Sequence, residues 1–191
     1  SNYDLQSRME EILQAVEAQF TYPVFVKPAG TGSSVGVSKA NDRDSLKNAL
    51  LQAGKFDEKI LVEEFIDGHE VEVAVLGNKS PIASVAGEID SGADFYDYDA
   101  KYNGQVKEIT PARIPQSWTN EIQLTTKKIY KALNAKGIIR VDYIVDESGK
   151  VNLLEVNTTP GMTETSFIPQ QVKAAGLDIS DVMHDIIENE F

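Results

Sequence analysis

Two short segments near the C-terminus, Arg140-Val-Asp142 and Leu154-Glu155-Val-Asn157, constrain the fold of this chain more than any other feature. Each alternates polar with aliphatic residues, and successive side chains of a β-strand point to opposite faces of a sheet. The sequence Asp146-Glu-Ser-Gly149 between them is typical of a turn. We therefore expect an antiparallel hairpin with its polar side chains side by side on one face: Arg140, Asp142, Glu155 and Asn157.

The polar face of this hairpin suits a magnesium ion. Asp142, Glu155 and Asn157 offer only hard oxygen ligands, which suit an ion that holds nucleotide phosphates while it keeps some waters. Arg140 adds a planar cation for a phosphate group or for an oxyanion that develops during a reaction. The alternative is a solvated polar face, which is ordinary in antiparallel sheets.

The composition indicates a soluble globular protein. The chain has 191 residues, of which 41% are hydrophobic, so it can bury the core of one large domain or two small ones. It contains no cysteine, which excludes disulfides and thiolate chemistry and fits a reducing compartment. The formal net charge of −12 argues against a nucleic-acid-binding surface, and no apolar run reaches membrane-spanning length. We expect a cytoplasmic protein that binds neither nucleic acid nor membrane.

Apolar periodicity divides the chain into three parts. Residues 1–21 carry a helical pattern that ends before Tyr22-Pro23. Residues 22–87 hold the strands and the helix of a small subdomain. Residues 88–191 hold a long aromatic and acidic stretch, the polar hairpin and the final helices, and form the larger subdomain.

A glycine- and serine-rich loop follows the strand that ends at Lys27. The loop runs over Pro28–Gly36 and contains Ser33 and Ser34. Glycines let backbone N–H groups approach a phosphate closely, while hydroxyl groups and a lysine add donors and charge. The loop is therefore a candidate phosphate site, although Gly and Ser also occur in ordinary turns.

The segment Glu63–Glu70 lies between two expected strands. The backbone of such a crossover can bind the edge of an adenine, and a carboxylate such as Glu70 can accept hydrogen bonds from both ribose hydroxyls. A charged linker at the edge of the fold is the alternative.

Two further segments suggest a covered site. The stretch Asp94–Tyr102 has aromatic side chains that need a surface to lie on, as in a lid over a ligand, and Lys101 would bring a cation to the phosphates. A self-packed Ω-loop is the alternative. After Gly161, Ser166 precedes a helix whose N-terminus could hold a carboxylate, a role compatible with that of an ordinary N-cap serine.

Taken together, these motifs resemble the D-alanine–D-alanine ligases, ATP-grasp enzymes of peptidoglycan synthesis. The resemblance covers nearly the whole chain and rests on Lys27–Gly36, on Phe95-Tyr-Asp-Tyr-Asp-Ala-Lys-Tyr102, on Arg140-Val-Asp142 and on Glu155-Val-Asn-Thr-Thr-Pro-Gly-Met162. It implies an α+β ATP-grasp fold, with two α+β subdomains of antiparallel or mixed sheets and the nucleotide between them. Residues 22–87 would be the small nucleotide-binding subdomain and residues 88–191 the catalytic one.

The resemblance also implies cofactors and a role for each matching position. ATP would be bound with two Mg²⁺ or Mn²⁺ ions, and the ions by Asp142, Glu155 and Asn157. The nucleotide contacts would come from Lys27, Ser33, Ser34, Glu63, Glu64, Ile66, Glu70, Phe95 and Lys101. The oxyanion would be met by Arg140 and the Gly161 N–H, and the second substrate by Lys101, Ser166, Phe167 and Gly161. Tyr102 and Ser33 would be the hydrogen-bonded pair that locks the lid.

The implied reaction joins two D-alanines through an acylphosphate, with release of ADP and phosphate. Two departures from the family pattern stand out: the N-terminal domain and a second phosphate-binding lysine have no counterpart, and Phe167 stands where many relatives carry leucine. The chain therefore resembles a C-terminal piece that is inactive alone. A nucleotide-binding module, or a ligase for another pair of amino acids, remains an alternative, and the full-length protein could be a homodimer.

Overall fold

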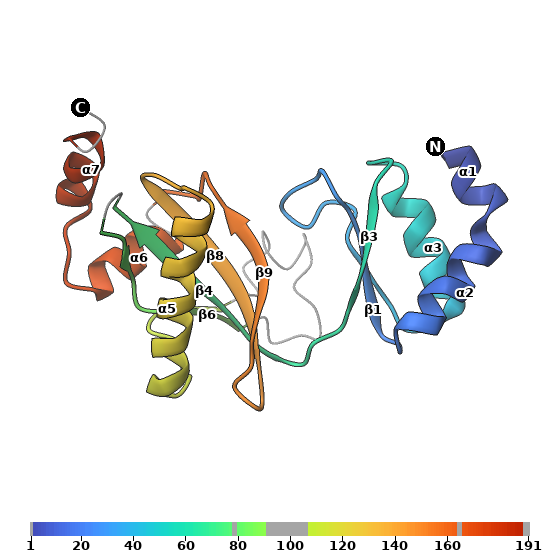
Figure 1. Cartoon of the computed structure of the whole chain (residues 1–191), viewed down its shortest axis with the longest axis horizontal. Coiled ribbons are helices and arrows are strands. Elements are labelled where there is room, and N and C mark those ends of the chain that lie inside the picture. Colours follow the sequence, from blue (N-terminus) through green and yellow to red (C-terminus); the bar gives the residue numbers. More distant parts are fainter. Residues whose placement is uncertain (1, 78–79, 91–106, 164–165, 189–191) are drawn as a thin grey trace. The chain divides into compact units, whose positions relative to one another are not determined.

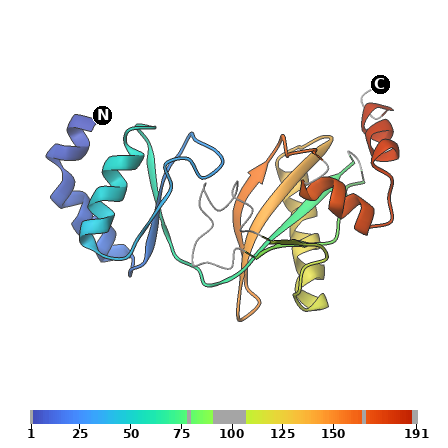
Figure 2. The same ribbon diagram turned by 180° about the vertical axis from the view of Figure 1, so that it is seen from behind.

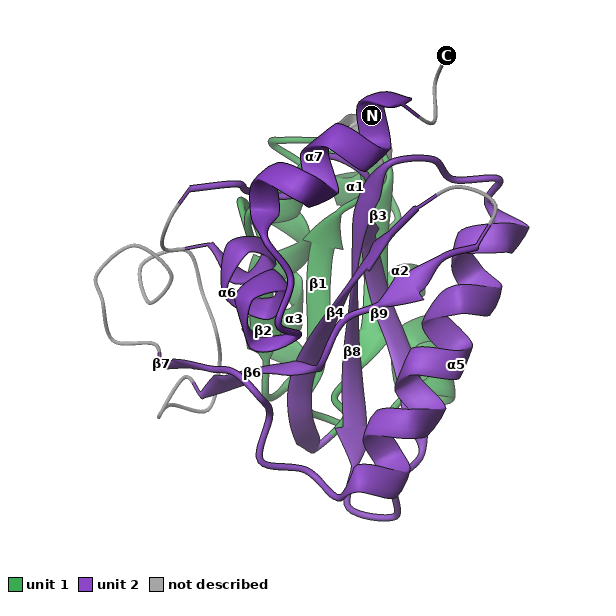
Figure 3. Ribbon diagram, turned by 90° about the vertical axis from the view of Figure 1, so that its left-hand side faces the viewer, with its two compact units in different colours: residues 1–66, 91–105 green, residues 67–90, 106–191 purple. Residues whose placement is uncertain are grey.

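A computed structural model describes residues 2–77, 80–90, 107–163 and 166–188. The chain divides into two compact units, residues 1–66 with 91–105 and residues 67–90 with 106–191 (Figure 3). Each unit has its own antiparallel sheet covered by helices, so the expected α+β class is confirmed. No helix in the described ranges has the length and apolar character needed to cross a membrane.

The first unit is a three-stranded sheet in the order β2-β1-β3 with helices on one face (Figure 1). Its elements are α1 (Asn2–Ser7), α2 (Met9–Gln19), β1 (Val24–Pro28), β2 (Ser38–Ala40), α3 (Arg43–Ala53) and β3 (Ile60–Glu64). Asp42 begins α3 with a capping box, in which its carboxylate accepts from the Ser45 N–H at 2.8 Å and the Ser45 hydroxyl accepts from the Asp42 N–H at 3.0 Å.

Alternation along β1 gives this sheet two different faces. Val24 and Val26 are buried with residues of α2 and α3, such as Leu13 and Leu46. The residues between them, Phe25 and Lys27, belong to the other face because β-strand side chains alternate. The covered face supplies the core of the first unit.

The second unit is built on a six-stranded sheet in the order β7-β6-β4-β8-β9, with β5 paired to β4. Its strands are β4 (Gly68–Leu76), β5 (Ile82–Ala83), β6 (Gly87–Asp90), β7 (Lys107–Ile109), β8 (Ile138–Asp146) and β9 (Val151–Asn157). Its helices are α5 (Gln116–Ala132), α6 (Phe167–Ala174) and α7 (Ile179–Glu188).

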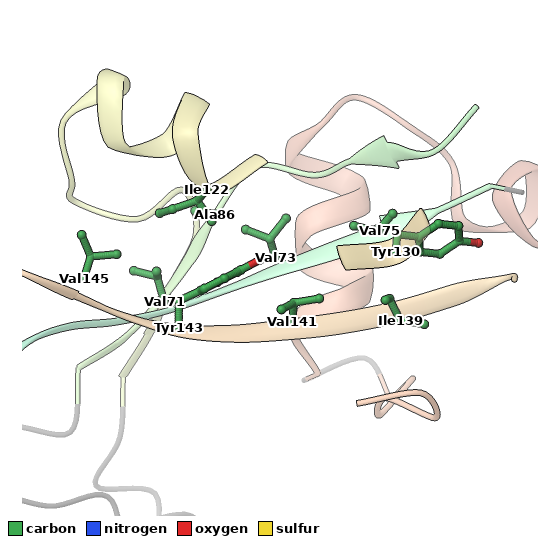
Figure 4. Packing of buried hydrophobic residues seen from close by; sticks show 10 residues of the cluster. All are labelled: Val71, Val73, Val75, Ala86, Ile122, Tyr130, Ile139, Val141, Tyr143 and Val145. Carbon is green, nitrogen blue, oxygen red and sulfur yellow. The ribbon is translucent and has the colours of Figure 1, made fainter. Parts of the chain in front are cut away.

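Helix α5 covers one face of this sheet, and α6 and α7 cover part of the other. Figure 1 shows α5 in front of β8, whereas Figure 2 shows it behind the strands with α6 in front. The core under α5 contains the residues shown in Figure 4: Val71, Val73, Val75, Ala86, Ile122, Tyr130, Ile139, Val141, Tyr143 and Val145. The opposite core joins Ala74 and Leu76 of β4 to Ile168, Val172 and Val182 of α6 and α7.

The hairpin of β8 and β9 contains a β-bulge beside Asp142. On one side of the irregularity Asp142 pairs with Glu155, whereas the next residue of β8, Tyr143, pairs with Leu153. Leu154 is therefore an additional residue in β9. Because side chains alternate, one additional residue exchanges the two faces for every residue beyond it.

The packing of β9 shows this exchange. Val151 and Val156 are an odd number of positions apart, yet both pack against the core under α5. Glu155 and Asn157, the neighbours of Val156, consequently belong to the opposite face. Because of the bulge, Val151 before it and Val156 after it both point into the core under α5.

Candidate active site

Polar side chains gather in rows across the central strands of the second unit. Glu72 of β4 pairs with Asp142 of β8, which pairs with Glu155 of β9. In the next row, Ala74, Arg140 and Asn157 are paired in the same way. Paired residues of antiparallel strands share a face, so the expected hairpin residues lie together on the face opposite α5.

Arg140 and Asp142 form a two-pronged ion pair at the centre of this group. Arg140 Nε donates to Asp142 Oδ1 and Nη2 donates to Oδ2, each at 2.8 Å. The amide Nδ2 of Asn157 donates to Asp142 Oδ2 at 2.9 Å and to Glu155 Oε1 at 3.1 Å. Burial lowers the pKa of Arg140, but pairing with Asp142 raises it by more. The pKa therefore lies above its usual range, and the guanidinium stays charged.

Glu72 completes the group and was not anticipated from the sequence. Its Oε2 lies 2.9 Å from Arg140 Nε, and its exposed fraction is 1%. Within the described residues neither of its carboxyl oxygens has a hydrogen-bond partner. Burial raises the pKa of Glu72 to about 9, against the lowering effect of Arg140. The signal that was missed is its place two residues after Glu70 in the alternating segment, which assigns it to the polar face.

The donor set of this face fits a hard divalent cation. Two carboxylates and the amide oxygen of Asn157 are available, and the amide N–H groups of Asn157 already hold both carboxylates in place. Across the described ranges, no three His, Cys, Asp or Glu side chains are arranged to hold a metal ion by themselves. At this face the third donor would be an amide, and Arg140 occupies both oxygens of Asp142.

The segment after β9 brings Gly161 and Ser166 together. A Cβ atom at Gly161 would lie 2.9 Å from Ser166 Oγ, so the hydroxyl takes the place that a side chain would fill. Ser166 is the N-cap residue of α6, but its hydroxyl makes no capping hydrogen bond with that helix. It accepts from the Thr163 N–H at 3.1 Å and lies 2.8 Å from Thr163 Oγ1.

Helix α6 is fixed to the sheet by two buried residues. Phe167 packs against Gly87 of β6, where an added Cβ would lie 2.8 Å from its ring. Gln171 Nε2 donates to the carbonyl oxygen of Glu72, and Gln171 Oε1 accepts from the Ala74 N–H, each at 3.0 Å. Gln171, a second residue that sequence reasoning missed, therefore ties the helix after Ser166 to the strand that carries Glu72.

The face of the first sheet opposite its described helices holds a second polar and aromatic group. Lys27 Nζ lies 2.7 Å from Glu63 Oε1. Beside this ion pair, the rings of Phe25 and Phe65 lie 6.1 Å apart, and Lys39 Nζ lies 4.4 Å from the centre of the Phe65 ring. An ammonium group beside aromatic rings is an arrangement that can bind a flat ring and an anionic group.

The loop after β1 is held in an unusual backbone conformation. Ser33 and Ser34 have φ angles of 54° and 59°, in the left-handed region that non-glycine residues rarely adopt. The start of the loop is anchored because the Gly30 N–H donates to Asp57 Oδ2 at 2.6 Å. The Lys59 N–H donates to the other carboxylate oxygen of Asp57. Together the Lys59 and Gly30 N–H groups lower the pKa of Asp57. Strained residues of this kind are common at ligand sites.

The remaining expected residues divide between described and undescribed parts of the chain. Glu70 is half-buried in β4, Ile66 is half-buried before it, and Glu64 is exposed at the end of β3. Phe95, Lys101 and Tyr102, together with the rest of the expected lid Asp94–Tyr102, lie outside the described residues.

Residues 1–188 match the family described as D-ala D-ala ligase C-terminus. The D-alanine–D-alanine ligase of Bacteroides fragilis is 52% identical over 170 residues, which are 88% of this chain and 52% of that protein. Among solved structures, the VanG D-Ala:D-Ser ligase from Enterococcus faecalis is 38% identical with a TM-score of 0.86, over 95% of this chain and 53% of that one.

An ATP complex is among the similar structures. The D-alanine–D-alanine ligase from Bacillus anthracis complexed with ATP is 30% identical with a TM-score of 0.74, over 92% of this chain and 55% of that one. The chain therefore spans about half the length of the curated relatives that it matches.

Proposed function

Because this chain belongs to the D-alanine–D-alanine ligase family, whose C-terminal part it matches, we propose that it carries the nucleotide, metal and oxyanion sites of an ATP-dependent ligase. The whole enzyme would join two D-alanines, form ADP and supply a precursor of peptidoglycan. The observation that carries the proposal is the gathering of Arg140, Asp142, Glu155 and Asn157 on one face of the second unit. ATP-grasp is the fold that the family implies.

The metal part of the proposal rests on the chemistry of the donor set. Asp142, Glu155 and Asn157 would hold the two Mg²⁺ ions expected in the family. Bound magnesium would neutralise charge on the transferred phosphoryl group. The chain's own contribution is to hold the donors in place, since Asn157 links the two carboxylates.

The nucleotide part rests on the face of the first sheet opposite its described helices and on the loop Pro28–Gly36. Lys27 would exchange its ion pair with Glu63 for the phosphates, and Ser33 and Ser34 would add donors from their strained backbone. Glu63, Glu64 and Ile66 would bind the base and Glu70 the ribose. Phe95, Lys101 and Tyr102 would act from the segment 91–106.

The reaction part rests on Arg140. The γ-phosphoryl group would pass to the carboxylate of the first D-alanine, and the amine of the second would attack the acyl carbon while phosphate leaves. The oxygen of that carbon becomes negative in the transition state, and preorganised donors are most effective there. Arg140 and the Gly161 N–H would be these donors, and Lys101 and Ser166 would bind the carboxylate of the second substrate.

A calorimetric titration tests the metal and nucleotide parts. A non-hydrolysable ATP analogue should bind the 191-residue chain only when magnesium is present. Glu155→Gln should weaken this binding at least about tenfold, the factor that 1.4 kcal/mol gives. Glu147→Gln, in the turn of the same hairpin, is the matched control and should bind normally. Equal affinities of both variants would exclude Glu155 as a metal ligand.

The choice of second substrate is a separate matter. The VanG structure is named a D-Ala:D-Ser ligase and is 38% identical to this chain, which keeps a ligase for another amine as a second candidate. Phosphate release should be measured with a chain extended at its N-terminus to the length of the relatives, using D-alanine alone and then D-alanine with D-serine. Faster release with D-serine would favour the second candidate.

A further inference from the structure

Arg140 has two carboxyl groups beside a single N–H. Asp142 Oδ1 lies 2.8 Å from Arg140 Nε, and Glu72 Oε2 lies 2.9 Å from the same nitrogen. Nε carries one hydrogen, and that hydrogen is directed at Asp142. Glu72 is therefore close enough to accept the Nε–H but does not receive it in this arrangement.

Comparison with Glu88, another buried acid of this sheet, shows how unusual Glu72 is. Glu88, with an exposed fraction of 4%, accepts hydrogen bonds from the backbone N–H, Nε and Nη2 of Arg113. Neither oxygen of Glu72 has such a partner among the described residues. Native proteins rarely leave a buried polar atom unsatisfied, because the loss of its water is then not offset.

The backbone of Glu72 is held on several sides. Its strand, β4, lies between β6 and β8 in the sheet, and its own carbonyl oxygen accepts a hydrogen bond from Gln171 Nε2 at 3.0 Å. Asp142, in contrast, is also bonded by Asn157, whose second partner is the exposed Glu155. A buried carboxyl group on a fixed backbone thus lies beside an arginine whose present partner, Asp142, belongs to the proposed ligand-binding group.

We propose that Glu72 is a positioning residue that accepts the Nε–H of Arg140 whenever Asp142 turns to another partner. The inference rests on the proposed role of Asp142 as a ligand of a cation. Without Glu72, an Arg140 that lost Asp142 would keep neither of the two carboxyl groups now beside its Nε, and its side chain would be able to change rotamer. With Glu72, the guanidinium keeps its orientation and its Nη atoms become available to an oxyanion.

Orientation of this kind matters because a misplaced donor contributes little to a transition state. The role does not require Glu72 to be ionised, since a neutral carboxyl group also accepts through its carbonyl oxygen. It does require an acceptor atom at this position, which leads to a test that needs neither nucleotide nor metal.

The test removes Asp142 and follows the Nε–H of Arg140 by NMR. The ¹⁵Nε–¹H resonance is assigned by its absence in Arg140→Lys. In Asp142→Ala we expect this hydrogen to remain in slow exchange with water, because Glu72 accepts it. In the double variant Asp142→Ala, Glu72→Leu the exchange rate should rise at least about tenfold, whereas Asp142→Ala, Glu72→Gln should retain the protection.

Glu88→Leu combined with Asp142→Ala is the matched control. It also removes a buried acid of the same sheet and lowers stability, but it leaves Glu72 in place, so the Arg140 resonance should keep its protection. Fast exchange in Asp142→Ala alone, or equal exchange with Leu and Glu at position 72, would overturn the proposal. Should Asp142→Ala lose its cooperative unfolding transition, Asp142→Ser is used instead, because its hydroxyl is too short to replace the carboxylate.

The outcome is separable from that of the proposed function. A chain that binds no magnesium nucleotide but protects the Arg140 Nε–H in Asp142→Ala would retain Glu72 as the positioning residue and lose the metal assignment. Normal nucleotide binding with fast exchange of the Arg140 Nε–H in Asp142→Ala would retain the metal assignment and exclude Glu72 as the positioning residue.

Discussion

The side-chain oxygen of Gln171 accepts a hydrogen bond from the backbone N–H of Ala74 at 3.0 Å. Ala74 lies where β4 changes its neighbour, because β4 pairs with β6 through Glu72 and with β5 from Val75 onward. The amide of Gln171 supplies hydrogen bonds at this gap in place of a strand. Helix α6, which begins just after Ser166, is thereby joined to the polar face of the sheet.

Gln171→Leu should lower the free energy of unfolding by about 2–4 kcal/mol, because the carbonyl oxygen of Glu72 loses the Gln171 amide and the Ala74 N–H keeps only the Ser84 hydroxyl, 3.1 Å away. Urea denaturation measures the change. Gln170→Leu is the matched control: it lies on the same helix and bonds the exposed Glu108, so its effect should stay within about 0.5 kcal/mol. Similar losses in both variants would contradict the role of Gln171.

The acid stability of the second unit should depend on Glu88. Hydrogen bonds from Arg113 lower the pKa of Glu88 to about 2, from its ordinary value of 4.5. Below pH 4.5 the unfolded chain therefore binds a proton that the folded chain does not. The contribution is complete above pH 4.5 and is lost as the pH falls through about 2.

The full shift would correspond to about 3 kcal/mol, and we expect about 2 kcal/mol because the Arg113 side chain is 57% exposed and water screens the pair. Unfolding free energies are measured from about pH 6 to about pH 3. Glu88→Gln should be less stable at the upper end and should lose less stability on acidification. Parallel pH profiles of the two proteins would be the contrary result.

Gly36 should be the least replaceable glycine of the loop Pro28–Gly36. Its φ angle is +77°, and an added Cβ would lie 2.8 Å from both Phe56 Cδ2 and Pro28 Cγ. Gly36→Ala should cost about 1–3 kcal/mol of stability and weaken nucleotide binding.

Gly32→Ala provides the control for Gly36→Ala within the same loop, since an added Cβ at Gly32 meets nothing within 4 Å. Its stability should change by less than about 0.5 kcal/mol. Thermal unfolding and nucleotide titration of the two variants, side by side, separate backbone strain from a general intolerance of side chains in the loop.

Arg140→Ala should lower kcat by about 10²–10³-fold, as expected when a donor to a developing oxyanion is removed. The measurement uses a chain extended at its N-terminus to the length of the relatives, whereas the 191-residue chain should release negligible phosphate in response to D-alanine. The KM for ATP should change little, because the oxyanion exists only during the reaction. Lys150→Ala, near the turn of the same hairpin, should retain full activity.

Local patterns were sufficient to predict the elements that carry the site. Alternation and the turn at Asp146–Gly149 predicted the hairpin, and the helix expected within residues 22–87 begins with a capping box at Asp42. Position in sequence also placed Ser166 immediately before a helix. These features could be predicted because strand alternation and helix capping depend on residues only a few positions apart in the sequence.

The missed residues act over long sequence separations. Gln171 is polar on an amphipathic helix and looks like a surface residue, yet it bonds Ala74 and Glu72 nearly a hundred positions earlier. Glu72 looks like one of several acids, and only the pairing of β4 with β8 brings it to Arg140. No pattern within one segment identifies such partners, because tertiary packing decides which polar residues become buried.

Because of the additional residue Leu154, the arrangement of the site depends on the number of residues in β9 and not only on their side chains. If β9 paired with β8 in the register set by the turn alone, Asp142 would face Leu154 and the side chain of Glu155 would be directed into the apolar core beneath α5. Deletion of Leu154 should therefore lower stability and binding more than replacing Asp142, Glu155 or Asn157 singly, while insertions in the exposed turn at Glu147 and Ser148 should be tolerated. Among natural variants of this hairpin, insertions and deletions should be found in the turn and should be absent from β9.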